Sequence, residues 1–236
     1  MKFTLFSSAI LALGLSATFA GTPTRSELAP TGRLSIDRAL VRTGIKPMIN
    51  WDIQFPKTAA DIVKIGAQGE IIAKERTMME VRVVGAAFQL GSNHTDLELK
   101  SRIGGSTWNH LFLGNDSEVH PNEVVQRQVV DAGTRIDFSA RAADGRGGWF
   151  ATRDTTGRDS SCLQALMDGD FVPNFVPAYD QGTAQSFLRQ FISSGNEVTV
   201  GPRAIIYLVE LYATDRNSPY FDMQDIVVVV SFKDLP

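Results

Sequence analysis

Four carboxylates and one carboxamide gather between the two most apolar segments near the end of the sequence. These residues are Glu210, Asp215, Asn217, Asp222 and Asp225. Calcium is bound in proteins by six to eight oxygen atoms from carboxylates, amide carbonyls and the backbone, at about 2.3–2.6 Å. If the flanking segments pair as a hairpin, Glu210 and Asp225 lie close together at its open end, and the loop supplies the other oxygens. The residues therefore predict a calcium site, with calcium as the cofactor.

The same acids also fit an ordinary solvated turn. The spacing is not that of an EF-hand loop, because, counted from Asp215, Tyr220 takes the place of the required glycine and Ile226 that of the final glutamate. Asp, Asn, Ser and Pro are common turn residues. In this alternative the acids are neutralised by arginine, and the candidate pairs are formed by Asp222 or Asp225 with Arg203 or Arg216.

Two tryptophans that follow glycine-rich turns suggest a second kind of site. Trp108 comes soon after Gly104-Gly105, and Trp149 comes directly after Gly147-Gly148. Flat aromatic rings can stack on sugar rings, so Trp108 and Trp149 are the candidate residues of a carbohydrate-binding module. The alternative is that these side chains fill the core between two sheets.

Residues with the spacing of a catalytic motif do not occur in this sequence. The three histidines, His94, His110 and His120, are too far apart for a local zinc motif. There is no nucleophile elbow, no phosphate-binding loop and no dinucleotide fingerprint. We therefore assign no catalytic residues. A secreted hydrolase that uses a carboxylate pair stays an alternative, although 26 acids make the choice of any pair arbitrary.

The N-terminal segment has the pattern of a secretory signal peptide. Lys2 precedes an apolar stretch, and small residues at the expected positions predict cleavage after Ala20. We expect a signal peptide over 1–20, a flexible leader over 21–31 and a single domain over 32–236. The product is expected to be secreted, periplasmic or on the cell surface, with no membrane span after cleavage.

Few other features bear on location or partners. Cys162 is the single cysteine, so no intramolecular disulfide forms; the thiol is either buried or paired with another chain. Asn93 and Asn115 begin triplets that are glycosylation acceptors in a eukaryotic host. The formal net charge is −3 and there is no basic patch, so nucleic acid is not expected as a partner.

Alternating apolar and polar residues predict half-buried strands over 48–55, 96–103 and 134–142. In the first, Trp51 lies on the apolar face and is expected in the core. Glycine-rich turns predict hairpins, and the unbroken apolar run at 226–232 predicts a strand covered on both faces. A short helix is expected near 184–193, with Thr183 as its N-cap.

These patterns predict an all-β fold, an antiparallel β-sandwich that is immunoglobulin-like or jelly-roll-like. We expect an exported, non-enzymatic protein with a structural, adhesive or surface-assembly role, stabilised by calcium. Its expected partners are further copies of itself, other surface proteins or a polysaccharide. The carbohydrate-binding module and the hydrolase remain the alternatives.

Overall fold

The structure is a computed structural model of the 236-residue chain. It describes residues 29–36, 49–157, 160–172, 186–218 and 220–235. The expected signal peptide and most of the expected leader lie outside these ranges. Within them, no helix has the length and apolar character needed to cross a membrane.

One sheet of the body has five antiparallel strands. Its order is β10 (Gln126–Val130), β5 (Thr77–Ala86), β15 (Ile226–Lys233), β14 (Ala204–Val209) and β13 (Leu163–Met167). The central strands carry long runs of β-branched residues, which suit a pleated surface. β14 and β15 pair antiparallel, which confirms the expected terminal hairpin.

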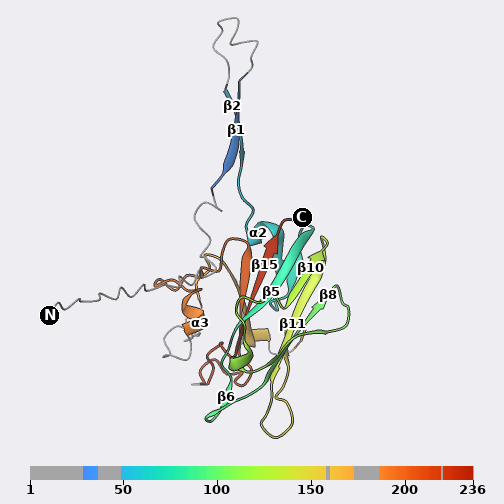
Figure 1. The fold of residues 1–236 in the computed structure, drawn as a ribbon, viewed down its shortest axis with the longest axis vertical. Coiled ribbons are helices and arrows are strands. Elements are labelled where there is room, and N and C mark those ends of the chain that lie inside the picture. Colours follow the sequence, from blue (N-terminus) through green and yellow to red (C-terminus); the bar gives the residue numbers. More distant parts are fainter. Residues whose placement is uncertain (1–28, 37–48, 158–159, 173–185, 219, 236) are drawn as a thin grey trace, which may run out of the picture.

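A second sheet packs against the first (Figure 1). Its order is β3 (Val63–Ile65), β4 (Ile71–Ala73), β11 (Arg135–Ala142), β8 (Leu97–Ile103) and β9 (Asn109–Gly114), with β12 (Arg153–Asp154) also paired to β11. The strands predicted over 96–103 and 134–142 are thus confirmed as β8 and β11. Gly104 and Gly105 adopt positive φ in the turn between β8 and β9, as the hairpin requires.

The main core lies between the two sheets. It contains alternate residues of each strand, among them Val81, Leu99, Phe138, Tyr207 and Val228, all at most 2% exposed. Successive side chains of a strand point to opposite faces, so this alternation places one face of each sheet in the core. The regular structure of the described chain is nearly all strand, and the predicted all-β sandwich is confirmed.

The five-stranded sheet is covered on its outer face as well. A second apolar cluster joins this face to the segments that follow β13, and its members include Leu166, Leu188, Ile206, Met223 and Val229. This second cover explains why β15 carries an unbroken apolar run, since both of its faces are buried.

The helices are short. α3 spans Ser186–Arg189, inside the predicted range, but Thr183 lies outside the described residues. α2 (Ala59–Ile62) was not predicted; it is a single turn with Thr58 at its N-cap. Smaller elements are η2 (Asp116–Glu118), η3 (Ser160–Cys162) and the pair β6 (Gln89–Leu90) and β7 (Asn93–His94).

The strand predicted over 48–55 forms, but its expected burial is wrong. β1 (Thr31–Ile36) and β2 (Ile49–Gln54) pair as a two-stranded ribbon, here called the arm, which stands away from the body (Figure 1). Trp51 is 67% exposed rather than buried in the core. Alternation reports that a strand has an apolar face, but it cannot report what covers that face.

Candidate metal centre in the terminal loop

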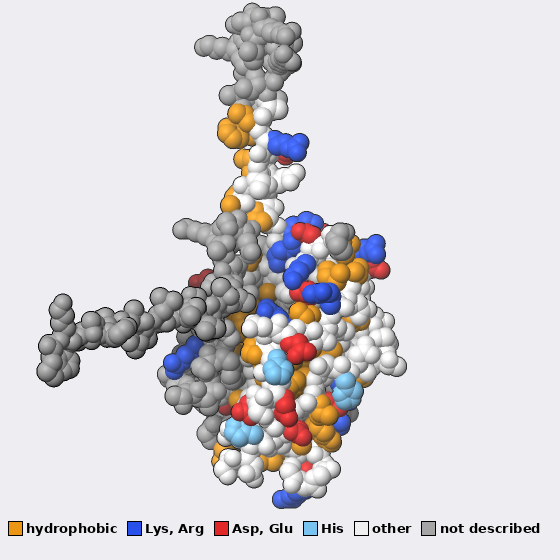
Figure 2. All heavy atoms as spheres, in the orientation of Figure 1, with side chains coloured by type: hydrophobic (Ala, Val, Ile, Leu, Met, Phe, Trp, Pro, Cys, Tyr) orange, Lys and Arg blue, Asp and Glu red, His pale blue; other side chains and the backbone are white. Residues whose placement is uncertain are grey.

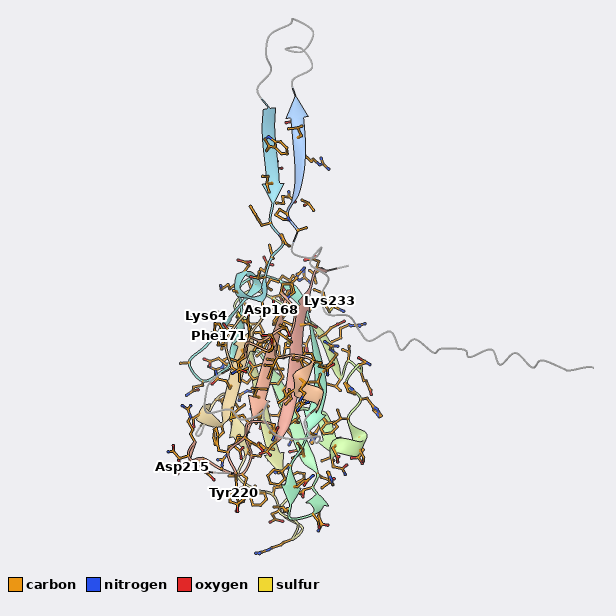
Figure 3. All side chains as sticks on the ribbon, turned by 90° about the vertical axis from the view of Figure 1, so that its left-hand side faces the viewer. Lys64, Asp168, Phe171, Asp215, Tyr220 and Lys233 are labelled. Carbon is orange, nitrogen blue, oxygen red and sulfur yellow. The ribbon has the colours of Figure 1, made fainter. Side chains whose placement is uncertain are left out.

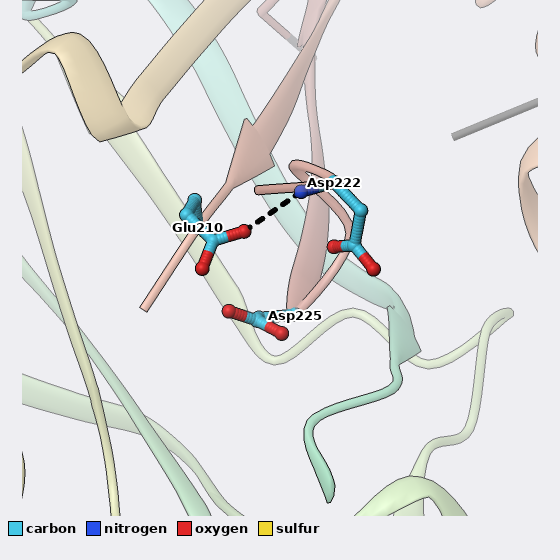
Figure 4. Close-up of side chains that lie close together, drawn as sticks. All are labelled: Glu210, Asp222 and Asp225. Atoms are coloured by element: carbon cyan, nitrogen blue, oxygen red, sulfur yellow. Dashed lines mark hydrogen bonds between the residues drawn. The ribbon is translucent and has the colours of Figure 1, made fainter. Parts of the chain in front are cut away.

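The end of the β14–β15 hairpin brings three of the predicted calcium ligands together. Glu210 directly follows β14 and Asp225 directly precedes β15, so the last strand pair sets them side by side. Asp222 approaches from the loop (Figure 4). One carboxylate oxygen from each of the three lies within 4.8 Å of the others. The site is at the end of the body opposite the arm, where Figure 3 labels Asp215 and Tyr220 of the same loop.

Glu210 is fully buried and organises the backbone of the loop. Its Oε1 accepts hydrogen bonds from the backbone N–H groups of Tyr212 (3.0 Å) and Ala213 (2.8 Å). Its Oε2 accepts from those of Asp222 (3.0 Å) and Met223 (3.4 Å). Buried backbone donors need such acceptors, so Glu210 joins the beginning of the loop to its end.

Among the described residues, Asp225 and Asp222 each accept fewer hydrogen bonds than Glu210 does. One oxygen of Asp225 accepts from the backbone N–H of Leu211 (2.5 Å). The two oxygens of Asp222 accept from the backbone (3.3 Å) and side-chain (2.6 Å) nitrogens of Gln224. A carboxylate offers about four lone-pair sites. Oxygen sites are therefore left over on both aspartates, beside a third acid.

Burial and mutual repulsion disfavour three negative charges here. Burial, followed by the charge of Glu210, raises the pKa of Asp225 well above its ordinary value. Burial raises the pKa of Asp222 as well, and the charge of Glu210 adds to the effect. The ion pairs among the described residues lie elsewhere, and none of them includes these three acids. Either a proton or a cation must offset the charge.

The other two predicted ligands lie apart from this cluster. Asp215 and Asn217 are exposed, and Oδ1 of Asp215 accepts from the backbone (2.9 Å) and side-chain (3.2 Å) nitrogens of Asn217. This is ordinary turn chemistry. Arg203 was expected to neutralise an acid of the cluster, but it forms a bidentate ion pair with Asp234 instead. Whether any of the five predicted residues binds calcium stays a prediction.

The two candidate sugar-binding tryptophans each carry an arginine on one ring face. The guanidinium of Arg102 lies 4.8 Å from the ring centre of Trp108, and that of Arg141 lies 4.3 Å from the ring centre of Trp149. Trp108 is half-buried and Trp149 is 37% exposed. Cation–π stacking thus occupies a face that a sugar would need. The carbohydrate-binding alternative stays untested.

The remaining candidate residues have structural contacts. His94 lies 2.8 Å from Asp116, and His110 lies 3.2 Å from Glu98, in both cases a nitrogen-to-oxygen distance. Cys162 is buried. Sequence reasoning missed the hydrogen bonds of Glu210 to four backbone amides, because they depend on a loop conformation that no local pattern encodes.

Comparisons of the chain with protein families, curated proteins and solved structures find no match. The candidate site therefore has to be judged by its own geometry.

Proposed function

We propose that the protein is an exported, non-catalytic β-sandwich with a structural or surface-assembly role, and that a calcium ion stabilises its terminal loop, bound by the free carboxylate oxygens of Asp222 and Asp225 beside the buried carboxylate of Glu210. The observation that carries the calcium site is the cluster of three carboxylates, two of them buried, with no ion pair to a cationic side chain among the described residues. The N-terminal sequence pattern supports export.

Calcium suits this cluster better than magnesium does. Calcium accepts irregular arrangements of oxygens, including bidentate carboxylates and backbone carbonyls. Magnesium requires a near-ideal octahedron and keeps several of its waters. A loop whose carboxylates already accept backbone hydrogen bonds offers an irregular set of oxygens.

Thermal unfolding in excess EDTA and then in calcium tests the proposal. A ligand that binds only the folded state, at 100 times its dissociation constant, adds roughly 2.7 kcal/mol. For a chain of this size, that corresponds to an increase in Tm of roughly 5–10 °C. The increase should be lost in the double variant Asp222→Asn, Asp225→Asn, and magnesium should give a smaller one.

Asp215→Asn is the matched control, because it removes an acid from the same loop but outside the cluster. It should keep the full response to calcium. If calcium leaves the wild-type Tm unchanged, or if the control loses the response as fully as the double variant does, the calcium site is rejected.

A further inference from the structure

The arm formed by β1 and β2 has six antiparallel residue pairs and extends away from the body (Figure 1). A two-stranded ribbon on its own is at best marginally stable in water. No other strand of the described residues pairs with either edge of the ribbon, so the backbone groups along both edges are ready to pair with another chain. The arm therefore needs a contact beyond those within the ribbon.

One face of the arm is apolar and open. The register pairs Leu34 with Trp51 and Gly32 with Ile53, so these four residues share a face. Leu34 is 49% exposed, Trp51 67% and Ile53 52%, and Phe55 just beyond β2 is 74% exposed. Figure 2 shows hydrophobic side chains along one side of the arm and charged ones on the other. Contiguous apolar surface of this kind marks an interaction site.

The other face of the arm carries one positive and one negative residue, and these lie opposite each other. Arg33 pairs across the ribbon with Asp52. The described part of the arm is therefore neutral overall. A strongly charged partner, such as a polyanion, finds no complementary charge here, whereas two identical neutral arms do not repel each other.

We propose that the arm binds the arm of a second copy of this chain, with the apolar faces stacked and the strands antiparallel about a two-fold axis. The proposal rests on the surface-assembly role proposed above and names its contact. Such an interface is self-complementary, as a two-fold dimer requires.

The size of the surface fits a weak, concentration-dependent dimer. A fully covered aromatic side chain buries about 150–250 Å², so the exposed parts of Trp51 and Phe55, with Leu34 and Ile53, offer on the order of 400 Å² per copy. A stable interface needs about 800 Å² per partner. The arm faces alone thus supply about half of the area.

A groove at the base of the arm adds to this contact area. It has a volume of about 690 Å³ and begins at Pro56. Its lining is mixed, with apolar and charged residues: Val200, Pro202, Phe232, Lys57, Arg203, Lys233 and Asp234. In an antiparallel pair, the far end of each arm lies near the base of the other, and so beside this groove. The arm and the groove together form a contact smaller than a standard stable interface, of the size found in weak and transient complexes.

Sedimentation velocity of the full purified protein over a range of concentrations tests the proposal, with two lysine variants of β2. Trp51→Lys places a charge on the apolar face, and Gln54→Lys places the same charge on the polar face of the same strand. We expect the wild type to dimerise. Trp51→Lys should weaken dimerisation at least tenfold, and Gln54→Lys should leave it within about twofold, because only the first charge is buried.

A second measurement reports on the contact itself. Acrylamide quenching of tryptophan fluorescence should decrease as the wild type is concentrated, and Trp51→Phe should dimerise without this change. Equal circular dichroism and Tm among the variants exclude unfolding as the cause.

Three outcomes overturn the proposal: a wild type that stays monomeric, equal effects of the two lysine variants, or a monomer that binds phosphatidylcholine vesicles through Trp51. A dimer that Trp51→Lys leaves intact rejects the arm contact and leaves the assembly role standing. Running each sample in EDTA and in calcium keeps this result separate from the test of the calcium site.

Discussion

Glu210 and Asp222, twelve residues apart, are joined by a hydrogen bond from the backbone N–H of Asp222 to Oε2 of Glu210 (3.0 Å; Figure 4). The next residue, Met223, has φ +59°, a conformation that is costly for a residue with a side chain. Met223 also donates to Oε2 of Glu210, and its side chain is fully buried. Glu210 thus holds the backbone of Asp222 and Met223 in a strained turn, and this turn places the Asp222 carboxylate in the cluster.

Glu210→Gln should lower the free energy of unfolding by about 2–4 kcal/mol, because an amide has one acceptor oxygen and leaves buried N–H groups unsatisfied. The backbone groups affected are those of Tyr212, Ala213, Asp222 and Met223. Urea unfolding measures the loss, and Asp215→Asn is the control because its carboxylate is exposed. A loss below about 0.5 kcal/mol, the range of ordinary surface changes, would show that these bonds do not hold the loop.

Asp225→Asn should change how stability depends on pH when calcium is removed. Because the pKa of Asp225 is raised in the folded state, the folded protein holds a proton that the unfolded chain has lost. Stability in EDTA should therefore fall as the pH rises from about 4 through the raised pKa. The amide that replaces this carboxyl group stays neutral at every pH, so the variant should lose much of this fall.

In the wild type, calcium should also remove the decrease in stability with rising pH, since the bound ion takes the place of the proton on Asp225. Urea midpoints from pH 4 to pH 8, in EDTA and in calcium, measure both effects. If the wild type in EDTA shows the same pH profile as Asp225→Asn, then Asp225 does not titrate in this range.

Tyr207→Phe tests the contact between the two sheets. The buried hydroxyl of Tyr207 donates to the backbone carbonyl of Gly69, and its ring lies against Phe138 with ring centres 5.0 Å apart. The variant keeps the ring but leaves the carbonyl unsatisfied, so the free energy of unfolding should fall by about 1–2 kcal/mol. Tyr220→Phe, an exposed tyrosine in the terminal loop, is the control. Equal stability of the two variants would mean that water replaces the lost donor.

The sequence was sufficient for the parts of the fold that follow from local pattern. Alternation located β8 and β11, and the unbroken run of β15 indicated cover on both faces. The hairpin placed Glu210 beside Asp225, because both lie next to paired strand ends. Asp222 joined them as predicted, although its position depends on the loop as a whole.

Other features depend on contacts that a single sequence does not encode. The alternation around Trp51 is as regular as that of β8. The apolar face of β2 is nevertheless exposed, whereas the apolar face of β8 lies in the core. What differs is the surface against which each strand packs. Asp215 has the same residue type as two members of the cluster, but its turn with Asn217 keeps it at the surface.

Arg141→Met should destabilise the outer face of the second sheet in a pH-dependent way. The Glu98 side chain, 6% exposed, contacts Arg141 (2.6 Å), Lys100 (2.8 Å) and His110 (3.2 Å). Burial opposes ionisation of Glu98, but Lys100 and Arg141 outweigh it and lower the pKa below 4.5. A lowered pKa stabilises the folded state above pH 4.5, and this contribution is lost as the pH falls through the lower value.

At pH 7 the variant should lose about 1–3 kcal/mol, since Glu98 keeps Lys100 but loses its nearest cationic partner. Below pH 4 the difference from the wild type should shrink, because protonated Glu98 no longer needs the arginine. Urea unfolding at pH 7 and pH 3 measures both values. Arg146→Met, in the exposed turn of the same hairpin, is the matched control. It should leave the free energy of unfolding unchanged at both pH values. A loss of equal size at both pH values would assign the effect to the stacking of Arg141 on Trp149 instead of to the ion pair.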